Sequence, residues 1–580
     1  MTIQNSSADK NQFDPLAVEE GLGGSGDRAT AMLSNIAKFI LGQWSTKLFS
    51  GSLLIIMSLV SILLLLAKGI YTTSPGDIFI PLHYGWSLLQ GLAPHQDIHT
   101  ALGAFVGVVN GLGHWLAGPS GHALIVANLI VGLFTAACMA WATRTRLPSF
   151  MGVVLTLSIF LLCISPRFLD GYYVEIDYIG QYNKHGWALL CTLLTFIYIP
   201  ARSNSVSTAQ LLVDALLAAL LITALFFLKV SYILVAGLMI ILGPFFIESA
   251  QRRLLALALF LAVLFIGLIN YKWGIIENYA LDVQMGLHSH SHDRVRFDVL
   301  FGQLLLLAGK GVLLVTMALL YLSSNIRDSR HFIGIPHPLI LAIIVLVGGF
   351  GIALGNLSWW NGIAPMSVLL VWEMWRRKEE ASINVEQSNL RLLAGAALVL
   401  LLFGSVIMDS LALVLHHFKA PPQRAVALSV RQDSPFRDIF VAKHFEDDYQ
   451  KYFGYMEKRL EELGARGKRI LNLDYVNPYP MLMSSPPPKK AMLWWKFQAA
   501  FSGEGVESPA AVLCQTDFVI VPEADYEHDR RSSMLATRIF FKERYMPIIN
   551  KKFQIVEENS EVKVYVPKDG EWSVFCAKHI

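Results

Sequence analysis

Residues 209–228 read AQLLVDALLAALLITALFFL, and they decide the fold class. Asp214 is the single charged side chain in this stretch. A helix of about 20 apolar residues spans the roughly 30 Å hydrocarbon core of a bilayer. Within that core the backbone polar groups must bond inside the segment, which a helix does by itself. The stretch is therefore predicted to be a membrane-spanning helix.

The rest of the chain repeats this pattern. Of its 580 residues, 54% are hydrophobic and 16% are charged, against about 25% charged in ordinary soluble domains. That balance excludes a string of soluble domains and a disordered chain, and a net charge of +3 gives no sign of a nucleic-acid partner. We predict an α-helical polytopic membrane protein with about eleven spans, at 50–68, 121–142, 149–166, 186–201, 209–228, 231–248, 254–272, 300–322, 336–355, 360–375 and 391–414.

Clusters of arginine and lysine occur at every second connection between these spans. Because cytoplasmic loops of membrane proteins carry an excess of Lys and Arg, the clusters are predicted to lie inside. The N-terminus is then cytoplasmic and the C-terminus extracytoplasmic. The apolar stretch 101–118 is expected to be a helix at the outer interface, since counting it as a span leaves one arginine cluster outside. The clusters are Arg144 and Arg146, Arg202, Arg252 and Arg253, Arg327 and Arg330, and Arg376, Arg377 and Lys378.

Two regions flank the predicted transmembrane domain, which covers residues 50–415. Residues 1–49 are expected to be a cytoplasmic segment, and apolar residues recur in it every three or four positions from Leu33 to Leu48. This spacing predicts an amphipathic helix that either lies on lipid or packs on the bundle. Residues 416–580 are more charged and contain proline, so we predict a small external α/β domain there.

The predicted external domain carries two cysteines. Cys514 and Cys576 each lie in or beside a strand-like run, and an external domain faces an oxidising compartment. We therefore expect a disulfide between them, with two buried thiols as the alternative. The strand-like runs are 469–473, 511–513, 517–521, 553–556 and 562–566, and the helical patterns are 446–464 and about 528–543.

Polar side chains in the first external loop are candidates for function, because ionisable groups near a membrane are costly and often functional. Asp77 follows a Pro-Gly turn shortly after the first span. It is a candidate catalytic carboxylate, and the alternative is a helix N-cap. His83 and Tyr84 begin a short amphipathic helical pattern and are candidate pocket residues, while Asp97 precedes the interfacial helix.

The second external loop contains paired acids and a lysine. Glu175 and Asp177 are two positions apart, so an extended backbone places both carboxylates on one side. Oxygen ligands of this kind suit a hard divalent cation such as Mg²⁺, and two solvated loop acids are the alternative. Lys184 follows in the same loop.

The third external loop contains the sequence HSHSHDRVRF at 288–297. His288, His290 and His292 occupy every second position, so an extended strand presents all three on one face. Three histidines on one face suit a zinc ion, although a polar loop is the commoner explanation. Arg294 and Arg296 suit either phosphate or lipid head groups. Lys229, at the outer end of a span, either snorkels to the interface or contacts phosphate.

Taken together, these features resemble the integral-membrane glycosyltransferases with the GT-C fold, especially the bacterial lipid A and protein mannosyl or arabinosyl relatives. The likeness covers roughly the first half of the chain. It rests first on one span followed by an external loop with an acid, Asp77, near the start of that loop. It rests also on the pattern that follows, Leu88-Leu89-Gln90-Gly91 and then Pro94 and Asp97. The arginine-flanked turn near residue 145, the acids of the second loop and an external C-terminal domain complete it.

The resemblance implies a reaction. Members take sugars from polyprenyl-phosphate donors, so it implies such a donor, an envelope lipid, glycan or protein acceptor, and a place in the bacterial cytoplasmic membrane. Asp77 matches the acid that serves as catalytic base or positions the acceptor. Glu175 and Asp177 match acids that help bind a divalent cation, here Mg²⁺ or Mn²⁺, and Asp97 joins them as a candidate for the acceptor or metal site.

The chain departs from the family pattern at two points. Asp77 is followed by Ile78 where many members have a second acid, and Thr100-Ala101-Leu102 stand where lipid A-type members have Lys-Pro-Pro. The departing phosphate still requires cations. The candidates for that role are Lys184, Lys229, Arg294 and Arg296.

Two other classes of membrane protein are alternatives. An O-antigen or capsule polymerase or ligase also has many spans and large external loops, and its centre is then expected in the third loop, at His288–Arg296. A transporter or flippase requires ionisable residues at mid-span or paired broken helices. Asp214 and Asp409 lie near span ends instead, and no inverted repeat is visible.

Overall fold

The computed structural model describes residues 46–289 with short gaps, parts of 407–417, and 425–577 with further gaps. The predicted N-terminal amphipathic helix and the predicted spans at 300–322, 336–355 and 360–375, with most of 391–414, lie outside the described residues. The seven other predicted spans all coincide with helices. These helices are α2 (Thr46–Leu65), α5 (His122–Arg146), α6 (Ser149–Ile164), α7 (Gln181–Tyr198), α8 (Thr208–Phe226), α9 (Val230–Phe246) and α10 (Ser249–Trp273).

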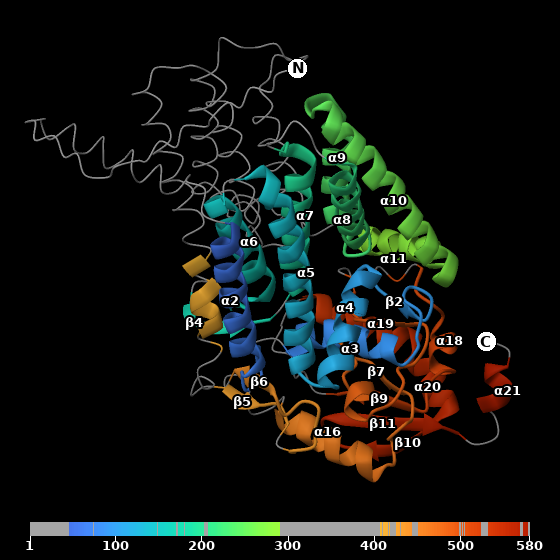
Figure 1. The fold of residues 1–580 in the computed structure, drawn as a ribbon. Coiled ribbons are helices and arrows are strands. Elements are labelled where there is room, and N and C mark those ends of the chain that lie inside the picture. Colours follow the sequence, from blue (N-terminus) through green and yellow to red (C-terminus); the bar gives the residue numbers. More distant parts are fainter. Residues whose placement is uncertain are drawn as a thin grey trace, which may run out of the picture.

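These helices form one bundle. Helices α2, α5, α6 and α7 lie side by side, and α8, α9 and α10 continue the bundle beyond α7 (Figure 1). Within the described residues, α5, α8 and α10 are long and apolar enough to cross a membrane, and α2, α6 and α9 contain shorter apolar helices. Large apolar side chains remain exposed along the bundle surface, as on α2 and α10. The chain is thus a multi-pass integral membrane protein.

The first predicted external loop folds into two helices, α3 (Pro75–Leu89) and α4 (Ala104–Ala117). The predicted amphipathic segment at 83–89 is the second half of α3, which is buried along nearly its whole length. Helix α4 has 14 residues and is therefore about 21 Å long. This length falls short of the roughly 30 Å hydrocarbon core of a bilayer.

The C-terminal region is built around a four-stranded sheet in the order β10-β11-β9-β7. Strands β7 and β9 are parallel, and the β9–β11 and β11–β10 pairs are antiparallel. The predicted strand at 511–513 is wrong, because Ser508 caps α18 (Pro509–Leu513) and accepts a hydrogen bond from Ala511 N. The other predicted runs match β7 (Ile470–Asn472), β9 (Phe518–Pro522), β10 (Phe553–Glu558), β11 (Val562–Pro567), α16 (Lys451–Glu462) and α19 (Ser532–Arg544).

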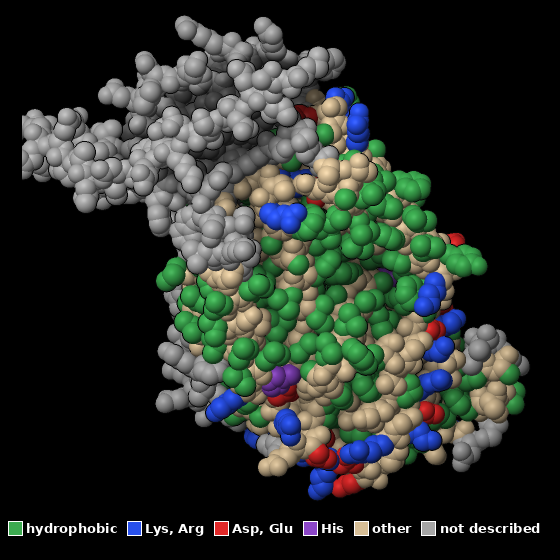
Figure 2. Space-filling model, in the orientation of Figure 1, with side chains coloured by type: hydrophobic (Ala, Val, Ile, Leu, Met, Phe, Trp, Pro, Cys, Tyr) green, Lys and Arg blue, Asp and Glu red, His purple; other side chains and the backbone are tan. Residues whose placement is uncertain are grey.

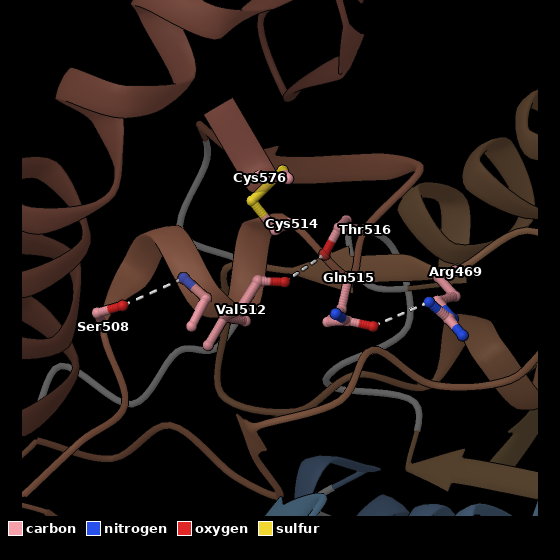
Figure 3. Close-up of a disulfide and its surroundings, with 8 residues drawn as sticks. Arg469, Ser508, Val512, Cys514, Gln515, Thr516 and Cys576 are labelled. Carbon is pink, nitrogen blue, oxygen red and sulfur yellow. Dashed lines mark hydrogen bonds between the residues drawn. A yellow bond between two sulfur atoms is a disulfide. The ribbon is translucent and has the colours of Figure 1, made fainter. Parts of the chain in front are cut away.

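The structure contains a disulfide between Cys514 and Cys576, as the sequence analysis expected. Cys514 directly follows α18, and Cys576 ends the short helix α21 (Trp572–Cys576), so neither cysteine lies in a strand (Figure 3). Cys138, Cys163 and Cys191 are buried free thiols on the bundle helices. The disulfide ties the end of the chain to the middle of the C-terminal region.

Short strands join the first loop to the C-terminal region. Strand β1 (Ile70–Thr72) pairs in parallel with β6 (Ile439–Ala442), which also pairs with β5 (Ala425–Ala427). Strand β2 (Ile98–His99) pairs in parallel with β8 (Ala491–Met492). The C-terminal region therefore lies on the same side of the bundle as the first loop. Figure 2 shows hydrophobic side chains over the bundle and charged ones gathered below it.

Candidate functional site

Asp77 lies in the first turn of α3, at its third residue. The N-cap alternative is therefore wrong, because the carboxylate is inside the helix, where the N-terminal end of the helix dipole favours a negative charge. The side chain is partly buried. Its Oδ1 accepts a hydrogen bond of 2.6 Å from the Tyr475 hydroxyl, which comes from the C-terminal region. A carboxylate and a phenol nearly 400 positions apart in sequence thus meet beneath the bundle.

Tyr475 is held in place by the segment that follows β8. Its carbonyl accepts a hydrogen bond of 2.7 Å from Trp495 N. Its ring meets the Trp494 ring edge-on at 6.0 Å, and the Lys496 ammonium lies 5.6 Å from the ring centre. The phenol that contacts Asp77 is therefore fixed by packing and by a backbone hydrogen bond, which keeps its hydroxyl in one position.

A second polar group, the histidine–carboxylate cluster, consists of His95, His99, Thr100 and Asp282. Asp282 is on α11 (Ile275–Ser289) and is buried. Its Oδ2 lies 2.8 Å from His95 Nδ1 and accepts a 3.0 Å bond from Thr100 N, while its Oδ1 lies 2.9 Å from His99 Nδ1. Because an ionised carboxylate only accepts hydrogen bonds, both imidazoles donate to it through Nδ1. Their Nε2 atoms therefore point away from Asp282.

Several polar atoms around this cluster have no hydrogen-bond partner within the described residues. They are His95 Nε2, His99 Nε2 and the hydroxyl oxygens of Tyr84 and Tyr279. Burial lowers the pKa of His99, but its hydrogen bond to Asp282 and the charges of Asp282 and Glu507 outweigh burial and raise that pKa overall. The environment of His99 thus favours a protonated, cationic imidazole.

The cluster and the Asp77 site are joined by one segment of chain. His99 O accepts a hydrogen bond of 2.9 Å from Leu493 N, next to the β2–β8 pairing. Two residues further on, Trp495 N binds Tyr475 O. Residues 491–495 therefore run from the histidine–carboxylate cluster to the phenol that holds Asp77. Sequence reasoning missed this cluster, and the available signal was an acid, Asp282, between the apolar residues Leu281 and Val283 of the third loop.

Two predicted phosphate-binding lysines lie at the N-terminal ends of the bundle helices α7 and α9. Lys184 is buried on α7, and its ammonium donates to Ser165 O at 2.7 Å, Ser165 Oγ at 3.3 Å and Pro166 O at 2.8 Å. Three protein oxygens thus match its three donors, so in this conformation Lys184 closes the end of α6. Lys229 precedes α9, and its ammonium lies 5.4 Å from the Tyr182 ring centre.

The remaining predicted site residues are dispersed. Asp97 Oδ2 accepts a 2.9 Å bond from Ala93 N and its Oδ1 lies 3.3 Å from Lys489 Nζ, so it stabilises its own turn and faces the C-terminal region. His83 and Tyr84 are buried on α3, and desolvation lowers the pKa of His83 to about 4. His288 is exposed near the end of α11, while His290, Arg294 and Arg296 lie outside the described residues.

The predicted metal ligands Glu175 and Asp177 are on β4 (Tyr172–Asp177), which pairs with β3 (Arg167–Leu169). The backbone is extended there, as the sequence predicted, and the two side chains lie outside the described part of the structure. Among the side chains that are described, no group of three or more His, Cys, Asp or Glu residues is arranged to hold a metal ion.

Comparison with models of known protein families finds no match, and neither does comparison with curated proteins. Solved structures do match. ArnT from Cupriavidus metallidurans, both in the apo state and bound to undecaprenyl phosphate, aligns with 89% of this chain and 98% of its own, with 10% identity and a TM-score of 0.46. The Archaeoglobus fulgidus oligosaccharyltransferase in complex with Zn and sulfate aligns with 89% of this chain and 73% of its own, with 11% identity and a TM-score of 0.37.

Proposed function

We propose that the protein is a glycosyltransferase that takes a sugar from a polyprenyl-phosphate donor at the outer face of the membrane. The acceptor is an envelope lipid, glycan or protein. The observation that carries this proposal is the position of Asp77, a partly buried carboxylate in the first turn of α3, oriented by the Tyr475 hydroxyl at 2.6 Å. A carboxylate held in this way suits a general base.

In the proposed reaction, an acceptor hydroxyl or amine attacks the anomeric carbon of the donor sugar. Asp77 takes the proton of that group as the new glycosidic bond forms. The bond between the sugar and the lipid phosphate breaks, and its electron pair leaves with the phosphate. The enzyme must orient the acceptor and neutralise the departing phosphate, because the lipid phosphate is already a leaving group.

We assign the neutralising charge to Lys229 and His99. Gly103 N and Phe105 N donate to Leu228 O and Phe227 O, which brings the start of α4 beside the residue that precedes Lys229. His99 lies four positions before Gly103, and its pKa is raised. The two cations therefore both lie close to the start of α4. Arg294 and Arg296 remain further candidates for this role.

Glu175 and Asp177 are proposed to hold a divalent cation, Mg²⁺ or Mn²⁺. They are two positions apart on β4, and an extended strand places alternate residues on one face, so the backbone fits a shared site. Such a cation would offset charge on the donor phosphate. Lys184, in the following helix, binds the carbonyls at the end of α6 and so supports the turn that leads into β3 and β4.

The test is the Asp77→Asn variant of the full-length chain, expressed in a deletion strain. Mass spectrometry of its lipid A, envelope glycans and glycoproteins identifies the product of the wild-type protein. Asp77→Asn is expected to abolish that product, with normal membrane insertion. Asp517→Asn, at an exposed carboxylate that accepts a hydrogen bond from Arg469 N, is the matched control and should retain the product. Full activity of Asp77→Asn, with a loss in His288→Ala, would instead support a polymerase or ligase centred on the third loop.

A further inference from the structure

A groove with a mostly polar and charged lining lies at the C-terminal end of α4. It has a volume of about 950 Å³ and is formed by the turn after α2, the turn between α4 and α5, the loop between β5 and β6, and residues near the ends of α16 and α17 (Tyr479–Leu482). The side chains that matter for its chemistry are Lys68, Ser120, Arg431, Arg437, Arg466 and Asp438. Basic residues outnumber acidic ones in its lining, so the groove is electropositive.

The carboxylates of the groove are already engaged. Asp438 accepts hydrogen bonds from Gly121 N at 2.9 Å and His122 N at 2.8 Å, and its Oδ2 lies 2.5 Å from His122 Nδ1. Asp433 lies 2.7 Å from an Arg431 nitrogen, and Arg431 also binds Glu461. These contacts leave no free carboxylate in the described lining to neutralise a further cation.

Two cations in the groove do have spare charge. Within the described residues, neither Lys68 nor Arg437 forms an ion pair, and Arg437 donates only to the backbone oxygen of Gln432. Arg466 is paired with Glu461 at 2.5 Å, so it adds less. The hydroxyl oxygen of Ser120 is buried and has no hydrogen-bond partner among the residues described. An anion in the groove would satisfy all three groups.

The groove begins where the lipid-facing surface ends. Lys68 follows the last turn of α2, where Leu66 is 66% exposed, and Ala117 of the groove follows Trp115 and Leu116 of α4, which are 71% and 59% exposed. Tryptophan is enriched at the boundary between hydrocarbon and water. Figure 2 shows the same change, from an apolar belt to charged side chains, over this end of the bundle. A molecule bound in the groove thus contacts both cationic side chains and an adjoining apolar surface.

We propose that the groove binds the phosphate of an anionic bilayer lipid, with its acyl chains along the exposed ends of α2 and α4. Lys68 and Arg437 neutralise the phosphate, and Ser120 donates a hydrogen bond to it. Arginine suits this task because its guanidinium binds phosphate oxygens in pairs. Basic residues at the membrane surface attract anionic lipids in general. The occupant is a lipid rather than a soluble anion because the apolar walls continue directly from the cationic ones.

The experiment is native mass spectrometry of the full-length protein, released from nanodiscs that contain equal phosphatidylglycerol and phosphatidylcholine. The wild-type chain is expected to retain phosphatidylglycerol selectively. The double variant Lys68→Gln/Arg437→Gln should lower that retention at least tenfold without changing retention of phosphatidylcholine. Lys458→Gln/Lys551→Gln, at two exposed lysines of the C-terminal region, removes the same charge elsewhere and should behave as wild type.

Three further measurements separate the possible occupants. The charge-conserving Lys68→Arg/Arg437→Lys variant should keep most of the lipid, which excludes misfolding as the cause of loss. Trp115→Ala should weaken lipid retention, since it removes the apolar anchor. Displacement of the lipid by inorganic phosphate at an equal concentration would overturn the proposal in favour of a soluble anion. Equal lipid retention in the double glutamine variant would overturn it outright.

Discussion

Replacing Tyr475 with phenylalanine removes a single hydroxyl from the proposed active site. The ring remains, and with it the edge-on contact with Trp494 and the position beneath Lys496. What is lost is the 2.6 Å hydrogen bond to Asp77 Oδ1. A hydrogen bond to a charged group contributes about 1.5–3 kcal/mol. Since roughly 1.4 kcal/mol corresponds to a tenfold change in rate, we expect kcat to fall about 10- to 150-fold in Tyr475→Phe.

The assay is transfer of a labelled sugar from lipid donor to acceptor in proteoliposomes. Asp77→Asn should lose more, roughly 10²- to 10⁴-fold, because it removes the base itself. In the double variant Tyr475→Phe/Asp77→Asn, the second change should add little, since the hydroxyl acts through the carboxylate. KM for the donor should stay within about threefold, because the hydroxyl positions Asp77 and is not assigned to donor binding.

Two results would refute this reasoning. A Tyr475→Phe variant as active as wild type would show that Asp77 needs no orientation by the phenol. Independent, additive losses in the double variant would show that Tyr475 acts elsewhere, for example by holding residues 494–496 in place. A melting temperature measured in detergent separates the latter case, because a structural role lowers stability along with activity.

Two further predictions follow from buried polar pairs. Arg146 and Asp214 form a buried ion pair of 2.6 Å between α5 and α8. Asp214→Ala should therefore lower the free energy of unfolding by about 3–5 kcal/mol, which is visible as a lower melting temperature. The same change at Asp433, an exposed partner of Arg431, should shift the melting temperature far less. Folding raises the pKa of His99 above its unfolded value of about 6.5. The protonated His99 therefore stabilises the fold fully below pH 6.5, and this stabilisation is lost as the pH rises through the higher pKa of the folded state. Melting temperatures between pH 5.5 and 8.5 should fall accordingly, and this slope should weaken in His99→Gln.

The spans were predictable because a long apolar run can adopt few structures inside a bilayer. A bilayer rejects unpaired backbone groups, so a stretch such as 209–228 must be helical, and the structure places α8 there at Thr208–Phe226. The four-stranded sheet was also largely predictable, because β7, β9, β10 and β11 each contain the β-branched residues valine or isoleucine, which favour strands. The strand prediction at 511–513 failed because three apolar residues that follow Ser508 and Pro509 fit a capped helix as well as a strand.

The polar contacts of the site were not predictable in the same way. Strands β1 and β2 have three and two residues, too few to show an alternating pattern, and their partners lie more than 300 positions away. His95 and His99 appear in the sequence as loop residues, and nothing near them points to Asp282. Local sequence predicts elements, whereas these contacts depend on how distant elements dock. Asp77 was singled out for its place in the chain, but its phenol partner became visible only in three dimensions.

The contacts between the C-terminal region and the first loop bear on whether residues 416–580 are a separate functional domain. By composition, residues 416–580 form a domain of their own, because they are more charged than the spans. The structure places Tyr475 against Asp77, pairs β6 with β1, and pairs β8 with β2. Leu493 N also binds His99 O, so the same segment reaches both polar groups of the proposed site. If Asp77 is the base, then the region that orients it is part of the catalytic unit, and the composition boundary near residue 416 is not a functional one.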